Sequence, residues 1–251
     1  MDRLENLKNI IMYLMADNRV SHRIPSSLEE RQRMMRALMN VWEPRPIAED
    51  FLKMQDAELQ IQREEKGIVE ISDITPQTSD IRLWQGDITR LKVEAIVNAA
   101  NAQALGCWAP LHNCIDNCIH SAAGIQLRKE CADKMQGRLL ATGDAFITQG
   151  YNLPARYVIH TVGPIIPDGV PTKEQEEQLA QCYRSCLDLA EQNGLESIAF
   201  CCISTGVFHF PNEQAAKIAI ETVKSYPRHA LKTIVFIVFL DKDRDIYQRL
   251  L

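Results

Sequence analysis

The sequence has no uninterrupted apolar run that approaches the roughly 20 residues a helix needs to span a bilayer. An apolar segment near the C-terminus, VFIVFL at 235–240, has the length of a buried strand instead. Residues 1–20 are amphipathic, carry charges throughout and lack a small-residue cleavage site, which predicts a helix rather than a signal peptide. We therefore expect a cytoplasmic protein with no membrane partner.

An excess of positive charge is also missing, because 28 lysines and arginines stand against 33 acidic residues and the net charge is −5. This balance gives no global attraction to nucleic acid, so we expect no nucleic-acid partner. An anionic ligand must then be bound by backbone amides, by a metal or by local geometry. A disulfide framework is not expected either: the eight cysteines of such a chain stay mostly reduced and serve as buried thiols, metal ligands or reactive groups.

The chain is long enough, at 251 residues with 46% hydrophobic content, to bury a full core. The pattern of residues 1–66 predicts a helical extension made of three helices. Ser27 and Glu30 are expected to form a capping box, and Pro44 and Pro46 are expected to interrupt the helices. This extension is either a partner-binding or lid module or a cap packed on the main domain. We favour the cap.

Residues 67–251 predict a second unit in which apolar β-branched runs alternate with helical patterns. Continuously apolar strands are covered on both faces, so we expect a three-layer α/β/α sandwich with a mixed, largely parallel central sheet. Ligands bind such sheets where loops leave the carboxyl ends of the strands. The predicted strands are IRLWQGDI, EAIVNAAN, DAFITQGY, RYVIHTVG, SIAFCCIS and TIVFIVFL, and the predicted helices lie near 115–135, 173–193, 212–225 and after Asp243.

Two thiols and an imidazole occur within the loop GCWAPLHNC, where Cys107, His112 and Cys114 have the spacing C-x4-H-x-C. This spacing makes a three-ligand metal site feasible, and soft thiolates with imidazole favour zinc. The alternative is that the cysteines are small buried hydrophobes. At another predicted strand exit, STGVF at 204–208 offers consecutive amides that can cradle a phosphate, although a plain strand-to-helix turn is the commoner explanation.

Five segments in order resemble the macrodomain family over residues 68–251: GDIT, VEAIVNAAN, IDNCIH, YVIHTVGP and ISTGVFHFP. The resemblance implies an ADP-ribose pocket. Asp87, with the Ile88 amide beside it, matches the acid that accepts from the adenine amino group, and Asn101 matches the asparagine facing the distal ribose. The second phosphate loop matches Ser204, Thr205, Gly206, Val207 and Phe208, with Phe208 shielding the distal ribose. Turn formation by Asp87 and Asn101 and core packing by Phe208 are the alternatives.

The chain departs from the family where many macrodomains have a run of glycines, because GCWAPLHNC stands there. The segment is similar to the zinc-containing macrodomain subgroup, whose helical extension fits residues 1–66. Zinc on Cys107, His112 and Cys114 keeps a fourth position open, which favours polarising and positioning the substrate. The sequence does not predict what Trp108 and Ala109 do to this loop.

Asp116 matches the acid that follows this loop in hydrolytic members, where it activates water or holds the ribose. Capping of the following helix is its alternative role. His120 and His160 are predicted to be packing or capping histidines. The resemblance implies a zinc-dependent protein mono-ADP-ribosylhydrolase of the glycosidase or ester type, acting on proteins modified at Asp or Glu side chains, with a lipoyl carrier protein as one acceptor. Separately, we expect a monomer. A non-catalytic ADP-ribose-binding module with a structural zinc and a hydrolase of a small ADP-ribose metabolite remain the alternatives.

Overall fold

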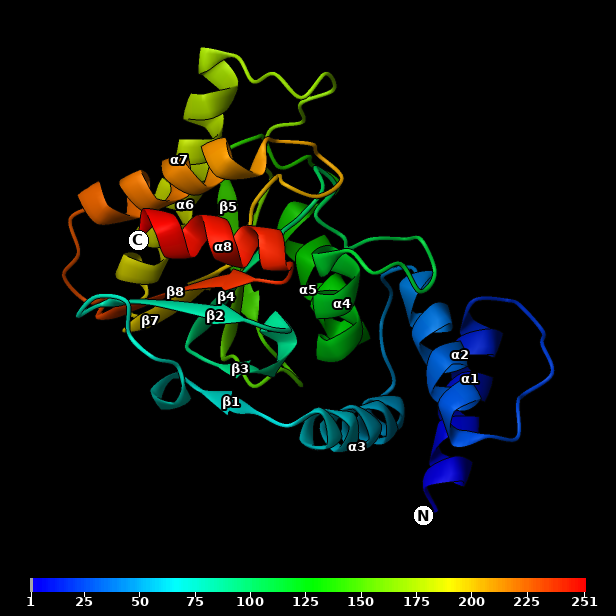
Figure 1. Ribbon diagram of the computed structural model, residues 1–251. Helices are drawn as coiled ribbons and strands as arrows, with labels where there is room; N and C mark the ends of the chain where they lie inside the picture. The colour runs from blue at the N-terminus through cyan, green and yellow to red at the C-terminus, as the bar shows by residue number, and fades with distance from the viewer. Residues whose placement is uncertain (1) are drawn as a thin grey trace.

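The computed structural model describes residues 2–251, beginning with three helices. They are α1 (Arg3–Asp17), α2 (Leu28–Asn40) and α3 (Glu49–Lys66), as the sequence predicts. Ser27 caps α2 by accepting from the Glu30 amide at 3.4 Å, but the Glu30 carboxylate accepts from the Ser27 hydroxyl at 2.7 Å and not from the Ser27 amide, so only half of the predicted capping box forms. In Figure 1 these helices lie to one side of the sheet, with α3 leading back to it.

A six-stranded sheet forms the centre of the remaining chain, with the strand order β2-β8-β7-β4-β6-β5. Every neighbouring pair is parallel except β5 and β6, so the sheet is mixed and mostly parallel, as predicted. All six predicted strands are present: β2 (Ile81–Gln85), β4 (Ala95–Ala99), β5 (Ala145–Gln149), β6 (Tyr157–Thr161), β7 (Ser197–Phe200) and β8 (Thr233–Val238). A separate parallel pair joins β1 (Val69–Glu70) to β3 (Leu91–Lys92).

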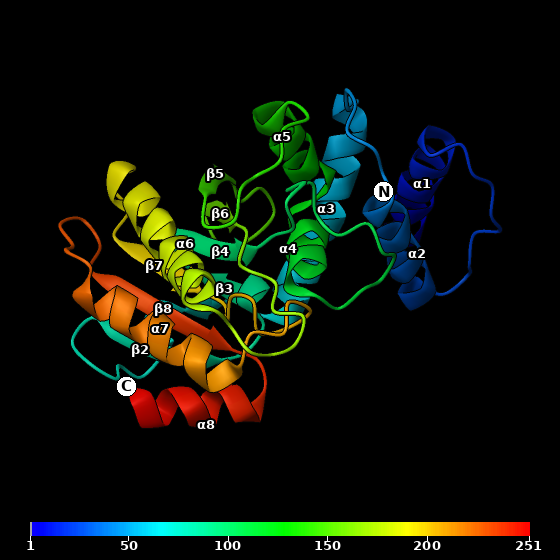
Figure 2. The same ribbon diagram turned by 90° about the horizontal axis from the view of Figure 1, so that it is seen from above.

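Helices flank this sheet, and one of the predicted helices is divided in two. The stretch expected near 115–135 is two helices, because Gly124 adopts φ +104°, a left-handed conformation that glycine tolerates. Figure 2 shows α4 and α5 between the sheet and the N-terminal helices, and α4 contacts both α2 and α3. The helices are α4 (Ile115–Ala123), α5 (Ile125–Met135), α6 (Lys173–Gln192), α7 (Asn212–Ser225) and α8 (Asp241–Leu250).

Two apolar clusters stabilise the molecule. The larger one surrounds the sheet, and the smaller one is built from α1, α2 and α3 around Trp42 and Phe51. Ile125, the first residue of α5, belongs to the smaller cluster and so joins the extension to the α/β part. Across residues 2–251, no helix has the length and apolar character needed to cross a membrane.

Candidate functional site

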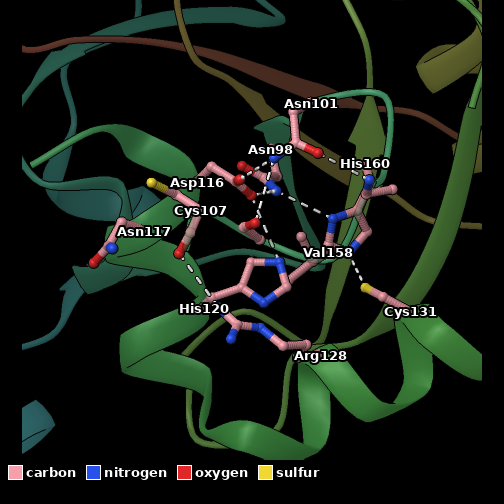
Figure 3. A network of polar contacts seen from close by, with 12 residues as sticks. Asn98, Asn101, Cys107, Asp116, Asn117, His120, Arg128, Cys131, Val158 and His160 are labelled. Carbon is pink, nitrogen blue, oxygen red and sulfur yellow. Dashed lines mark hydrogen bonds and ion pairs between the residues drawn. The ribbon is translucent and has the colours of Figure 1, made fainter. Parts of the chain in front are cut away.

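Asn101 follows β4 and makes contacts in two directions. Its Oδ1 accepts from the amides of Gln103 (3.0 Å) and Ala104 (3.2 Å), so it forms the turn given as its alternative role. Its Nδ2 points toward Gly106 O (3.3 Å) and Asp116 Oδ2 (3.5 Å). The turn therefore fixes the amide group beside the carboxylate that the sequence singles out (Figure 3).

Asp116 lies in the first turn of α4 with only 5% of its surface exposed. The alternative capping role is wrong, because Cys114 is the N-cap and its Sγ accepts from the Asn117 amide at 3.4 Å. Burial raises the pKa of Asp116 to about 6, against the opposing effects of the Asn98 hydrogen bond and the Arg128 charge. Asp116 is thus a buried carboxyl group that the helix does not need as a cap.

His120 lies one helical turn after Asp116, with its Nε2 3.6 Å from Asp116 Oδ1. Neither ring nitrogen has a hydrogen-bond partner among residues 2–251, and burial lowers the pKa of this imidazole well below its usual value. The ring also limits residue 106 to glycine, because a Cβ there would come within 2.8 Å of it. His120 therefore packs between Asp116 and the start of the cysteine loop, in agreement with the predicted packing role.

His160 fits the predicted packing role. Its ring stacks on Phe146 with centroids 4.8 Å apart, and its Nδ1 accepts from Asn98 at 3.1 Å. The other nitrogen lies 2.9 Å from Thr148 Oγ1. His120, Cys131 and His160 do bring ligand-type atoms within 4.8 Å of one another, but both nitrogens of His160 are already engaged by protein groups.

The cysteine loop brings together the three residues predicted to bind metal. The ligand atoms of Cys107, His112 and Cys114 lie within 4.8 Å of one another, and Cys107 Sγ is 3.5 Å from His112 Nδ1. Burial and then the neighbouring Cys107 thiol raise the pKa of Cys114 to about 12. Thiols become ligands when a metal cation displaces their protons, and a set of two sulfurs and one imidazole fits zinc.

The loop at 204–208, predicted to cradle a phosphate, has backbone amides that are free to donate. In the described chain, the amides of Gly206, Val207 and Phe208 donate to no other protein group. Ser204 adopts φ +65°, and its buried Oγ has no partner in residues 2–251. A Cβ on Gly163 would collide with this oxygen, so glycine there lets the β6 exit approach the loop closely. The loop can thus offer several donors to one anionic ligand.

Asp87 and Ile88 lie just beyond the carboxyl end of β2. Asp87 Oδ1 accepts from the Thr89 amide at 2.9 Å and the Thr89 hydroxyl at 2.7 Å, which is the turn-forming alternative. Its Oδ2 is 3.6 Å from Lys66 Nζ at the end of α3, while Ile88 is buried. One carboxylate oxygen is therefore committed to the turn, and the other lies near the helical extension.

Asn98 and Arg128 are parts of the site that the sequence analysis missed. Asn98 is fully buried on β4 and donates to Asp116 Oδ1 at 2.8 Å. A polar residue inside the apolar run EAIVNAAN was a signal that could have identified it. Arg128 is a buried cation on α5 that donates to the Cys107 carbonyl at 3.3 Å, and no local pattern marks it (Figure 3).

The chain is similar in sequence and in structure to several known proteins. The sequence profile described as Macro domain matches residues 97–219. A protein named protein-ADP-ribose hydrolase from Treponema medium is 48% identical, with 96% of each chain covered. One of the same name from Staphylococcus aureus (strain MRSA252) is 46% identical, covering 99% of this chain and 97% of the other. A Trypanosoma brucei macrodomain in complex with ADP-ribose superposes with a TM-score of 0.65 at 31% identity, covering 90% of this chain and 96% of that one.

Proposed function

Because this chain belongs to the macrodomain family, we propose that it hydrolyses the bond between mono-ADP-ribose and a modified protein. Relatives that match nearly its whole length at 46% and 48% identity carry the name protein-ADP-ribose hydrolase. The single observation that supports hydrolysis best is the position of Asp116. It is a buried carboxylate beside the Asn101 amide, two residues from Cys114, a predicted metal ligand.

We further propose that the protein is a member of the zinc-containing subgroup, with Cys107, His112 and Cys114 as ligands. The argument rests on the donor set and on its clustering within 4.8 Å. A zinc ion held there supplies a Lewis acid beside the pocket. The finer parts of the proposal are an ester linkage to an Asp or Glu side chain and a lipoyl carrier protein as acceptor, which derive from the subgroup resemblance. We propose in addition that the protein acts as a monomer.

The protein's own groups have separate tasks in this proposal. The amides at 206–208 bind the diphosphate, and Asp87 accepts from the adenine amino group through its Oδ2. Asn101 orients a hydroxyl of the distal ribose. Asp116 accepts a proton from the attacking water, and general-base help of this kind typically contributes about 10²–10⁴ in rate.

The test is release of ADP-ribose from a protein carrying it on an acidic side chain, with zinc measured in the same sample. We expect stoichiometric zinc, loss of cleavage after chelation and recovery when zinc is returned. Cleavage that persists in metal-free protein would remove zinc from the proposal while keeping the hydrolase. Cadmium substitution that leaves the rate and pH profile unchanged would limit the metal to a structural role.

A reader of ADP-ribose is the second candidate, because Asn101 Oδ1 is already used twice in its own turn. Tight ADP-ribose binding without cleavage by the zinc-loaded protein would favour it. Cleavage of a small ADP-ribose ester, with none of modified protein, would favour the metabolite hydrolase instead. The same protein preparation serves all three assays.

A further inference from the structure

Arg128 connects the end of α2 to the cysteine loop. Its Nη1 donates to the carbonyls of Asn40 and Trp42, both at 2.8 Å, and its Nη2 donates to the carbonyl of Cys107 at 3.3 Å. The side chain is 3% exposed, and a guanidinium stays charged in proteins. A buried cation is tolerated only when its hydrogen-bond partners are in place. The guanidinium therefore links the position of the loop to the position of the extension.

Trp108 lies against the same cation. The guanidinium carbon of Arg128 is 4.1 Å from the centre of the Trp108 ring, within the range of a cation–π contact. This contact gives a role to a residue whose effect the sequence does not predict. The loop is thus held at Cys107 by a hydrogen bond and at Trp108 by ring stacking.

Asn40, the last residue of α2, holds the middle of the loop. Its Oδ1 accepts from the Leu111 amide at 2.9 Å, and its Nδ2 donates to Ser121 Oγ at 3.0 Å. Leu111 has φ +60°, a left-handed conformation that costs a residue with a Cβ about 1–2 kcal/mol. The Asn40 contact offsets part of this strain immediately before the ligand His112.

Arg36 lies one turn earlier on α2 and reaches His112 itself. Its Nη2 donates to the His112 carbonyl at 2.8 Å and to Asn117 Oδ1 at 2.9 Å. Asn117 in turn donates from Nδ2 to the Ala109 carbonyl at 2.9 Å. Four side chains therefore hold backbone groups along a loop with no regular secondary structure, and two of them, Arg36 and Asn40, come from the extension.

We propose that α2 helps to hold the metal site in place. Arg36 and Asn40 on α2, together with Arg128 on α5, are positioning residues that keep the loop at 107–114 in the conformation that binds the metal. This inference rests on the zinc part of the proposed function. Ordering a loop costs conformational entropy for each residue. Contacts that order the loop before the ion binds lower this cost on binding, and we expect them to slow the loss of the ion. Partners of this outer kind typically contribute about 10–100-fold to metal affinity.

The experiment compares full-length Arg36→Ala and Asn40→Ala with two matched controls. Arg33→Ala removes an exposed arginine from the same helix, and Asn18→Ala removes a contact to the Leu38 carbonyl that stays within the extension. Zinc transfer to a chelating dye gives the rate of zinc loss, amide hydrogen exchange reports on 107–114 in metal-free protein, and thermal unfolding gives stability. We expect Arg36→Ala and Asn40→Ala to lose zinc about 10–100-fold faster. Exchange at 107–114 should also rise in both variants, while both controls match the wild type.

Unchanged zinc loss and unchanged exchange at 107–114 in both loop variants would overturn the inference. So would an equal acceleration in Asn18→Ala, because that result would reflect general loosening of the extension. Arg36 is half-exposed, so Arg36→Ala decides the question if Asn40→Ala does not fold. A wild type that takes up no zinc would contradict the zinc proposal alone, and exchange in the metal-free variants would still decide whether α2 orders the loop.

Discussion

The Asn98 side-chain amide lies 2.8 Å from Asp116 Oδ1 and 3.1 Å from His160 Nδ1, so one nitrogen joins the site carboxylate to a core histidine. Asn98 is central in this arrangement because β4 is an interior strand with β6 and β7 on its two sides. The position of Asp116 is thus set from the sheet beneath it as well as from α4.

Replacing Asn98 tests how much its hydrogen bond to Asp116 contributes to stability and to turnover. Asn98→Ala leaves the Asp116 carboxylate without its buried donor, and we expect a loss of about 1–3 kcal/mol in the free energy of unfolding. Turnover should fall as well, because Asp116 is no longer held toward Asn101. Urea unfolding and ADP-ribose release measure the two effects. Lost stability with unchanged turnover would limit Asn98 to the core.

Replacing Asp116 separates chemistry from binding. Asp116→Asn keeps the shape of the side chain and its contact with Asn98 but removes the basic oxygen. We expect turnover to fall about 10²–10⁴-fold, the usual contribution of a general base, with ADP-ribose affinity nearly unchanged. Calorimetric titration with ADP-ribose beside the release assay checks this. An equal loss of affinity and turnover would instead indicate that the pocket has collapsed.

Replacing Gly163 tests the anion loop without changing any residue of the loop itself. The added Cβ of Gly163→Ala meets Ser204 Oγ and comes within 2.9 Å of Ile203 Cγ2, so the loop must shift. Overpacking of this kind costs about 1–3 kcal/mol, and we expect ADP-ribose affinity to fall about tenfold or more. Gly169→Ala is the control for ADP-ribose affinity, since its Cβ meets no atom within 4 Å; its φ of +72° disfavours a Cβ, so this variant is expected to lose stability as well. Equal affinities in both variants would contradict the role of the loop.

Most of the fold follows from local pattern. All six strands lie within the predicted apolar runs because strands buried on both faces need continuous apolar sequence. The break at Gly124 escaped prediction because the residues on both sides of it favour helix and the glycine alone decides the geometry. Helix boundaries such as Cys114 as the cap of α4 also depend on where the loop enters, and one sequence does not fix that.

The candidate site likewise contains some residues that the local sequence predicts and others that it does not. Asn101, Asp116 and the cysteine loop were predictable because they lie within one short stretch of motif. The residues that hold the loop were not, because Asn40 is 71 residues from Leu111 and Arg36 is 76 residues from His112. Such contacts are decided by how the extension packs on α4, which periodicity and spacing do not describe.

His160 makes a prediction about pH. Burial lowers its pKa from 6.5 to about 3, so between these values the unfolded chain binds a proton that the native protein does not. Native stability therefore falls as pH decreases from 6.5 toward 3, by up to about 1.4 kcal/mol per pH unit from this group. Above pH 6.5 both states hold the neutral ring, and His160 gives no slope.

Comparison with His160→Gln isolates this contribution from that of Asp116, whose raised pKa acts in the opposite direction. The difference in free energy of unfolding between wild type and variant should be constant above pH 6.5 and should shrink as pH falls below it. Urea titrations of both proteins, kept metal-free so that zinc binding adds no pH dependence, measure this difference. A difference that stays flat down to pH 4.5 would mean that His160 accepts a proton in the folded core, and that burial does not keep the ring neutral.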